Sequence, residues 1–161
     1  MNGSKVTIDP ARKINDDILA CIMSDSPHLV ERCKSLSISK QAWINVIREG
    51  FSGEMVVGLA RKMRVPQKEV TSWLHTTPRT IQRYIESQEK LSPDISDRLA
   101  QLVMVFCRSN EVFKDEDKVS MWLKSPNYAL GGVSPLSLMD TMTGIELVLD
   151  ELGRIEHGVF I

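Results

Sequence analysis

The chain has 161 residues, a formal net charge of −1, 42% hydrophobic residues and 25% charged residues. This length favours one domain or two small domains that share a core, and the composition is ordinary for a globular protein. No run approaches the roughly 18 apolar residues of a transmembrane helix, and the first residues lack the apolar core of a secretory signal, so we expect a cytoplasmic protein with no membrane partner.

The predicted elements are helices along the whole chain. Asp, Ser or Thr followed directly by Pro is a typical helix start, and this pair begins at Asp9, Ser26, Thr77, Ser92 and Ser134. Apolar residues then recur at helical spacing, and no segment alternates as a strand does, so we expect an all-α fold. The expected segments are 9–25, 26–36, 39–50, about 52–63, 66–75, 76–87, about 93–113, 114–125, 134–144 and 143–158. Gly50 and Gly53 are expected to end the third segment.

The charge is distributed unevenly. Residues 60–90 carry seven basic and three acidic side chains, a net charge of +4, whereas residues 114–161 carry four basic and eight acidic ones, a net charge of −4. A basic middle and an acidic end suggest two different partners. The alternative is chance variation of the exposed surface.

The middle of the chain has the dimensions of a helix-turn-helix, with two short helices around His75. Ile81 and Ile85 are four residues apart and share the buried face of the second helix. Its polar residues therefore face outward, as the base-reading residues of a recognition helix do. Arg can bind guanine, Gln can bind adenine, and the helix N-terminus can hold a phosphate. The candidate DNA-binding residues are Thr77, Arg79, Thr80, Gln82, Arg83 and Lys90.

Two points stay open for this motif. His75 stands where a turn glycine is usual, and the same geometry also occurs as plain packing with a solvated Arg/Gln face. Lys62, Arg64 and Lys68 would add a sequence-independent attraction to phosphates. One such motif reads only a few base pairs, so a DNA-binding form is expected to be a homodimer on a two-fold operator.

The segment 122–144, WLKSPNYALGGVSPLSLMDTMTG, is punctuated unlike the rest of the chain. Gly131 and Gly132 allow backbone conformations that other residues resist, and Pro126 and Pro135 mark the ends of a loop. Its apolar residues are numerous enough to seat the loop on a helix. By these features alone it is either a tight connection between helices or a protruding edge.

The stretch 122–160 resembles the C-terminal domain of Xre/MbcA/ParS-type antitoxins. The characteristic series is Trp-Leu, Pro-Asn, Leu-Gly-Gly, Pro-Leu, Asp-Thr and Gly, then a helix with Val, Leu and Arg-Ile, and a terminal Gly. Here the series is Trp122-Leu123, Pro126-Asn127, Leu130-Gly131-Gly132, Pro135-Leu136, Asp140-Thr141, Gly144, Val148, Leu152, Arg154-Ile155 and Gly158. The preceding residues resemble the Xre-like helix-turn-helix and linking helix of the family, so the resemblance covers about residues 50–161.

The resemblance implies an antitoxin of a type II toxin–antitoxin pair. The usual partner in the family is a RES-type toxin, an enzyme that degrades NAD, and the antitoxin blocks it through the C-terminal domain. The family also dimerises and represses its own operon by binding operator DNA. The alternative is a stand-alone helix-turn-helix transcriptional regulator whose C-terminal domain only dimerises.

We expect three regions in the chain. Residues 1–45 form an N-terminal helical segment that dimerises or completes the core, residues 46–113 form the helix-turn-helix region, and residues 114–161 form the toxin-binding domain. No nucleophile–base pair, metal-ligand set or phosphate-binding loop is recognisable, and the three cysteines and three histidines are scattered. We therefore expect no enzymatic activity, no metal and no cofactor.

The C-terminal residues divide into an expected core and expected contacts. Trp122, Leu123, Leu136 and Leu147 are apolar at helical spacing and are expected to be buried. Arg154 is the first candidate for a charge-directed contact, because its guanidinium offers a rigid fork of donors; the alternative is a role in complementing the helix dipole. The candidate toxin-binding residues are Asn127, Tyr128, Gly131, Gly132, Arg154, Glu156, His157, Gly158 and Phe160.

Overall fold

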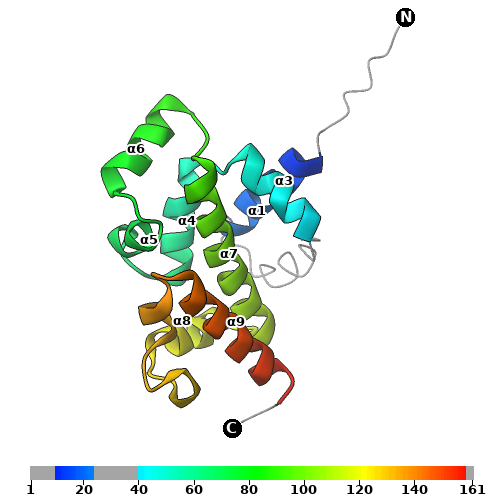
Figure 1. Ribbon diagram of the computed structural model, residues 1–161, viewed down its shortest axis with the longest axis vertical. Coiled ribbons are helices and arrows are strands. Elements are labelled where there is room, and N and C mark those ends of the chain that lie inside the picture. Colours follow the sequence, from blue (N-terminus) through cyan, green and yellow to red (C-terminus); the bar gives the residue numbers. More distant parts are fainter. Residues whose placement is uncertain (1–9, 24–39, 159–161) are drawn as a thin grey trace, which may run out of the picture.

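The computed structural model describes residues 10–23 and 40–158, and within them it is built from helices (Figure 1). The α-helices are α1 (Pro10–Met23), α3 (Lys40–Glu49), α4 (Gly53–Met63), α5 (Gln67–Trp73), α6 (Pro78–Ser87), α7 (Pro93–Phe113), α8 (Glu116–Lys124) and α9 (Met142–Glu156). Two 3-10 helices, η1 (Tyr128–Leu130) and η2 (Pro135–Leu138), lie between α8 and α9. The all-α prediction is confirmed, while the expected helix at 26–36 lies outside the described residues.

Helix α7 is the central element of the fold. In Figure 1 it runs down the middle of the molecule, with α5 and α6 on one side, α1 and α3 on the other, and α8 and α9 around its lower half. The Ser92 side chain caps its first turn by accepting from the Ile95 N–H, and Pro93 occupies its first position. Its bounds are those predicted from the sequence. Burial of Leu99, Val103 and Phe106 ties it into one continuous core.

The turn between α5 and α6 uses a left-handed residue, as the helix-turn-helix prediction requires. His75 has φ 54°, the conformation that favours glycine, so a side chain occupies a turn position where a glycine is usual. The α4 helix approaches α6 closely at Gly53, where an added Cβ would lie 2.7 Å from Ile85 Cγ1. Gly53 is the first residue of α4, so the prediction that it ends the preceding helix was wrong; Gly50, with φ 85°, follows the end of α3.

Two expectations for the C-terminal part were also wrong. The segment 134–144 does not form one helix: η2 ends at Leu138, and Thr141 starts α9 by accepting from the Gly144 N–H. Leu147 is 47% exposed rather than buried. Ile145, Val148 and Leu152 form the buried stripe of α9, and a residue two positions after Ile145 is turned by about 200° around the helix, away from that stripe. Leu123 is buried as expected, and Trp122 and Leu136 are half-buried.

None of the helices in the described part of the chain is long and apolar enough to span a membrane.

Candidate functional site

Helix α6 presents the predicted polar face to solvent. Ile81 is fully buried and Ile85 half-buried, while Arg79, Gln82 and Arg83 are exposed on the other side. The start of the helix is fixed by Thr77, whose hydroxyl accepts from the Thr80 N–H at 3.1 Å. The two threonine hydroxyls are also 2.9 Å apart. The N-terminal turn is therefore preorganised, with its polar side chains projecting outward.

These side chains surround a hollow of about 490 Å³. It is lined by Thr77, Arg79, Thr80, Gln82, Arg83 and Glu86. Five of the six predicted DNA-binding residues are thus brought together, and Lys90 is exposed beyond the end of α6. The sequence reasoning missed Glu86, whose Oε1 accepts from Gln82 Nε2 at 3.0 Å. Their spacing of four residues is the available signal, because such pairs are neighbours on a helix.

Two basic side chains before α5, Lys62 and Arg64, form ion pairs with acidic residues of α8. Arg64 contacts Asp117 of α8 at 2.6 Å, and Lys62 lies 3.5 Å from Glu116, with its side chain only 7% exposed. Lys124 in turn donates to the Arg64 carbonyl oxygen at 2.8 Å. Part of the basic middle is therefore paired with the acidic end. The expectation that Lys62 and Arg64 add free phosphate attraction is weakened, because their charge is shared with carboxylates.

The turn of the helix-turn-helix also touches the C-terminal part. His75 Nε2 lies 3.2 Å from the carbonyl oxygen of Asp140, in the connection between η2 and α9. This hydrogen bond holds the turn, and with it the start of α6, against the segment that begins α9.

Asn127 shapes the loop after α8. Its Oδ1 accepts from the Ala129 N–H at 2.8 Å, and its Nδ2 donates to Glu151 Oε1 at 3.3 Å. The backbone of Asn127 also pairs with Val133 across the two glycines. Gly131 and Gly132 have φ of 80° and 79° and are exposed. Asn127 is half-buried and the glycines follow it around a tight loop, so these three predicted contact residues set the shape of the loop.

Arg154 joins this loop through a shared carboxylate. Its Nε donates to Glu151 Oε2 at 2.8 Å, while the other oxygen of Glu151 accepts from Asn127. Glu151 is only 8% exposed, so its carboxylate is held by the hydrogen bond and charge of Arg154 and has little contact with water. Arg154 is thus part of an intramolecular network, and its side chain keeps 35% exposure beside the loop.

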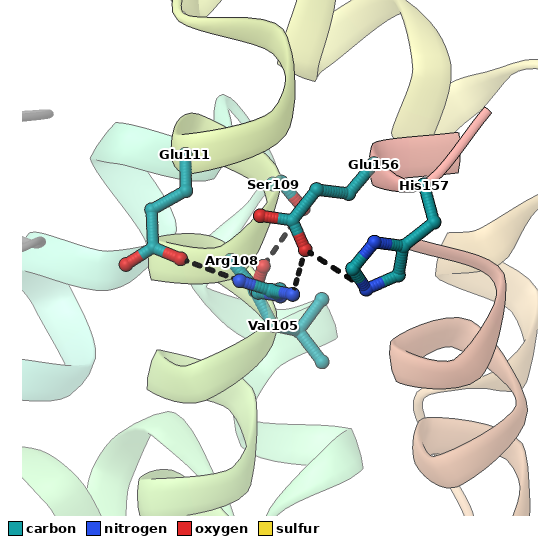
Figure 2. A network of polar contacts seen from close by, with 6 residues as sticks. All are labelled: Val105, Arg108, Ser109, Glu111, Glu156 and His157. Atoms are coloured by element: carbon teal, nitrogen blue, oxygen red, sulfur yellow. Dashed lines mark hydrogen bonds and ion pairs between the residues drawn. The ribbon is translucent and has the colours of Figure 1, made fainter. Parts of the chain in front are cut away.

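The end of α9 is tied to α7 by a second network (Figure 2). Arg108 of α7 pairs with Glu111 through Nη1 at 2.9 Å and with Glu156 through Nη2. His157 is exposed, and its Nε2 lies 3.9 Å from the same Glu156 carboxylate. The sequence held no signal for the pair of Arg108 with Glu156, because the two residues are 48 positions apart. Gly158 is exposed, and Phe160 lies outside the described residues.

Three exposed apolar side chains lie in the Asn127 loop or on the helix that the loop contacts. Tyr128 is 92% exposed, Val133 41% and Leu147 47%. Val133 pairs with Asn127 through the backbone, and Leu147 lies one turn before Glu151, the carboxylate that Asn127 contacts. We call Tyr128, Val133 and Leu147 the loop-edge patch. Exposed apolar groups in one small domain make it a candidate binding site, and sequence reasoning assigned Leu147 to the core instead.

Comparison with known proteins matches both parts of the chain. Residues 42–104 match the Antitoxin Xre-like helix-turn-helix domain, and residues 108–158 match the Antitoxin Xre/MbcA/ParS C-terminal toxin-binding domain. An "Antitoxin Xre" of Yersinia enterocolitica is 31% identical over 118 residues, which are 73% of this chain and 80% of that protein. A "Prs ADP-ribosylating antitoxin" of a Sphingobium species is 27% identical over 126 residues, 73% of this chain and 79% of that protein.

The fold is also found among solved structures. A chain of the crystal structure of the M. tuberculosis MbcT–MbcA toxin–antitoxin complex superposes with a TM-score of 0.53 at 24% identity, covering 68% of this chain and 96% of that one. The helix-turn-helix and the C-terminal domain predicted from the sequence resemblance are both confirmed by these matches. The chain belongs to the Xre family of antitoxins, with an Xre-like helix-turn-helix followed by a C-terminal toxin-binding domain.

Proposed function

We propose that this antitoxin blocks a cognate RES-type, NAD-degrading toxin through its C-terminal domain and represses its own operon by binding operator DNA through α6. It acts by binding, without catalysis of its own, in the cytoplasm, where the operator and NAD are found. The observation that carries the first part is the loop-edge patch, an exposed apolar surface on the domain that matches the toxin-binding model. The RES class of the toxin rests on the resemblance of residues 122–158 to this family.

The loop-edge patch supports a protein partner by its chemistry. Tyr128 is an almost fully exposed aromatic on a loop whose shape is set by Asn127 and two glycines. A rigid aromatic that is apolar on its face and polar at its tip is the side chain most often found at the energetic centre of a protein interface. Arg154, joined to the same loop through Glu151, would supply a charged rim.

The exposed face of α6 supports the DNA-binding part. Arg79 and Arg83 are exposed around one hollow beside Gln82, at the N-terminal end of a helix that follows a tight turn. One α6 helix spans only a few base pairs, so we propose that the antitoxin binds as a homodimer on a two-fold operator. The proposed regions remain 1–45, 46–113 and 114–161, with the DNA-binding role in the second and the toxin-binding role in the third.

The toxin-binding part is tested by co-expression with the product of the neighbouring gene. The wild-type chain should relieve growth arrest and co-purify with that product. Tyr128→Ser and Leu147→Ser should each lower the affinity about thirtyfold, since truncating a central interface residue typically costs about 2 kcal/mol. Ile44→Ser is the matched control, because Ile44 is 40% exposed on α3, outside the C-terminal domain. Equal affinity for all three variants would contradict this assignment of the site.

A second candidate function is favoured by the same patch. An exposed apolar surface also fits a second copy of the chain, as in a regulator whose C-terminal domain only dimerises. Light scattering of the purified Tyr128→Ser chain separates the two. A homodimer that persists without Tyr128 supports the antitoxin function, whereas dissociation to monomers with no toxin bound by the wild type supports the alternative.

A further inference from the structure

We infer that Glu86 sets the base preference of α6 by orienting the amide of Gln82 for an adenine in the major groove. This inference rests on the proposed DNA-binding function and names one element of its specificity. It starts from the hydrogen bond between Gln82 Nε2 and Glu86 Oε1, which are 3.0 Å apart on the exposed face of α6. Both side chains line the same hollow as Arg79 and Arg83.

The carboxylate decides which way the amide faces. A free glutamine amide can turn over, offering either its oxygen or its nitrogen to a base, and the two orientations read different bases. An ionised carboxylate only accepts hydrogen bonds, so Glu86 must receive an N–H of Gln82. Glu86 is exposed on the same polar face of α6 as Gln82. The amide nitrogen therefore faces Glu86, and the amide oxygen points away from that carboxylate.

The orientation matches the edge of adenine. Adenine presents a donor, its N6 amino group, beside an acceptor, N7. The turned-out oxygen of Gln82 accepts from N6, and the second hydrogen of its NH₂ group remains for N7. Guanine presents two acceptors on this edge, and the oxygen of Gln82, itself an acceptor, can form no hydrogen bond with either. Cytosine offers the donor but no neighbouring acceptor, so it satisfies only half of the pair.

The negative charge of Glu86 weakens DNA binding, so this residue fits a role in sequence discrimination better than a role in general affinity. A carboxylate among phosphates opposes DNA binding at every sequence, because the attraction to DNA comes from positive charge. Arg79 and Arg83, which line the same hollow, supply that attraction. A residue that weakens binding to all DNA while fixing the geometry of its neighbour increases discrimination between sites. Glu86 is thus a positioning residue that acts through Gln82.

The experiment is a selection from duplexes with a randomised centre, using the full-length chain. The wild type should select a motif with adenine at one position of each half-site, favoured about tenfold over the other bases, the discrimination expected of a bidentate pair. In Glu86→Gln and Glu86→Ala the amide of Gln82 can face either way. Both variants should bind the selected duplex at least as tightly as the wild type, while the adenine preference falls to about twofold.

Matched variants separate the possible outcomes. Glu89→Gln removes the same charge just after α6, where Glu89 contacts Ser87, and should keep the adenine preference. Gln82→Ala should lose it entirely. A wild-type preference that survives in Glu86→Gln, or a uniform loss of affinity without a change of preference, overturns the inference and leaves the DNA-binding function standing. If the wild type selects no sequence, the DNA-binding function fails and the inference fails with it.

Discussion

Two glycines of α9, Gly144 and Gly153, differ in the space around them: Gly144 is closely packed and Gly153 is open. A Cβ on Gly144 would lie 2.0 Å from the Leu138 carbonyl oxygen and 2.8 Å from the Thr141 hydroxyl that caps the helix. A Cβ on Gly153 would meet nothing within 4 Å. Gly144 is thus required by the close approach of η2 to the start of α9. Gly153 has no such requirement and costs the helix conformational entropy.

Substituting each glycine by alanine should therefore move stability in opposite directions. Gly144→Ala forces the η2–α9 connection apart, and we expect the free energy of unfolding to fall by about 3 kcal/mol. Gly153→Ala should raise it by roughly 0.5–1 kcal/mol, since alanine is the better residue inside an open helix. Urea denaturation followed by circular dichroism measures both. A Gly144→Ala chain as stable as the wild type would contradict the close approach.

Buried serines show how α7 organises its neighbours at the scale of elements. Ser96 Oγ accepts from the Phe51 N–H at 3.2 Å and donates to the Leu91 carbonyl oxygen at 3.2 Å. It thereby joins the connection before α4 to the connection before α7. Ser109 is equally buried, but its hydroxyl only donates to the Val105 carbonyl oxygen of its own helix.

Removing the two hydroxyls should have unequal effects. Ser96→Ala leaves the Phe51 N–H buried without its partner, and we expect a loss of about 1–3 kcal/mol in the free energy of unfolding. Ser109→Ala leaves no buried N–H group without an acceptor, so we expect the free energy of unfolding to change by no more than about 0.5 kcal/mol. Comparing the urea midpoints of the two variants makes the measurement. Equal losses would show that the hydroxyls matter only through local packing.

Local rules in the sequence were enough for most elements, because caps and apolar spacing act within a few residues. Ser92, Pro93 and the apolar stripe of α7 predicted that helix to the residue. The same rules failed between Ser134 and Thr141, where a 3-10 turn and a new cap replace one continuous helix. They also placed Leu147 in the core, although its position on α9 is turned away from the buried stripe of Ile145, Val148 and Leu152.

For the candidate site, the sequence located the exposed face of α6 but not the contacts that control it. Helical spacing predicted that Arg79, Gln82 and Arg83 face outward, and all three are exposed in the structure. The links of Arg64 to Asp117 and of Arg108 to Glu156 join residues 53 and 48 positions apart. Such partners are decided by how whole helices pack, and a short window of sequence carries no information about them.

The whole molecule is organised around a helix that both regions share. The match to the helix-turn-helix model ends at residue 104 and the match to the toxin-binding model begins at residue 108, both inside α7. Helices α3 and α4 contact α7, and α8 and α9 contact it as well, around its lower half in Figure 1. His75 and Lys124 add hydrogen bonds across the same junction. The proposed regions 46–113 and 114–161 therefore share α7 as a common packing element.

We expect the two regions to unfold together as a result. Trp73 is buried in α5, and Trp122 of α8 packs on Phe113 with ring centroids 5.4 Å apart, so each reports on one region. Variants that keep only one of these tryptophans, with the others replaced by Phe, should give coincident urea midpoints by fluorescence, as two-state unfolding requires. Circular dichroism of the same samples is the control for helix content. Midpoints that differ beyond error would mean that the C-terminal domain opens while α6 remains folded. α7 couples the unfolding of the two regions only if both unfold in one cooperative step. With different midpoints, the chain could release a toxin from its C-terminal domain while α6 stays folded and able to bind DNA.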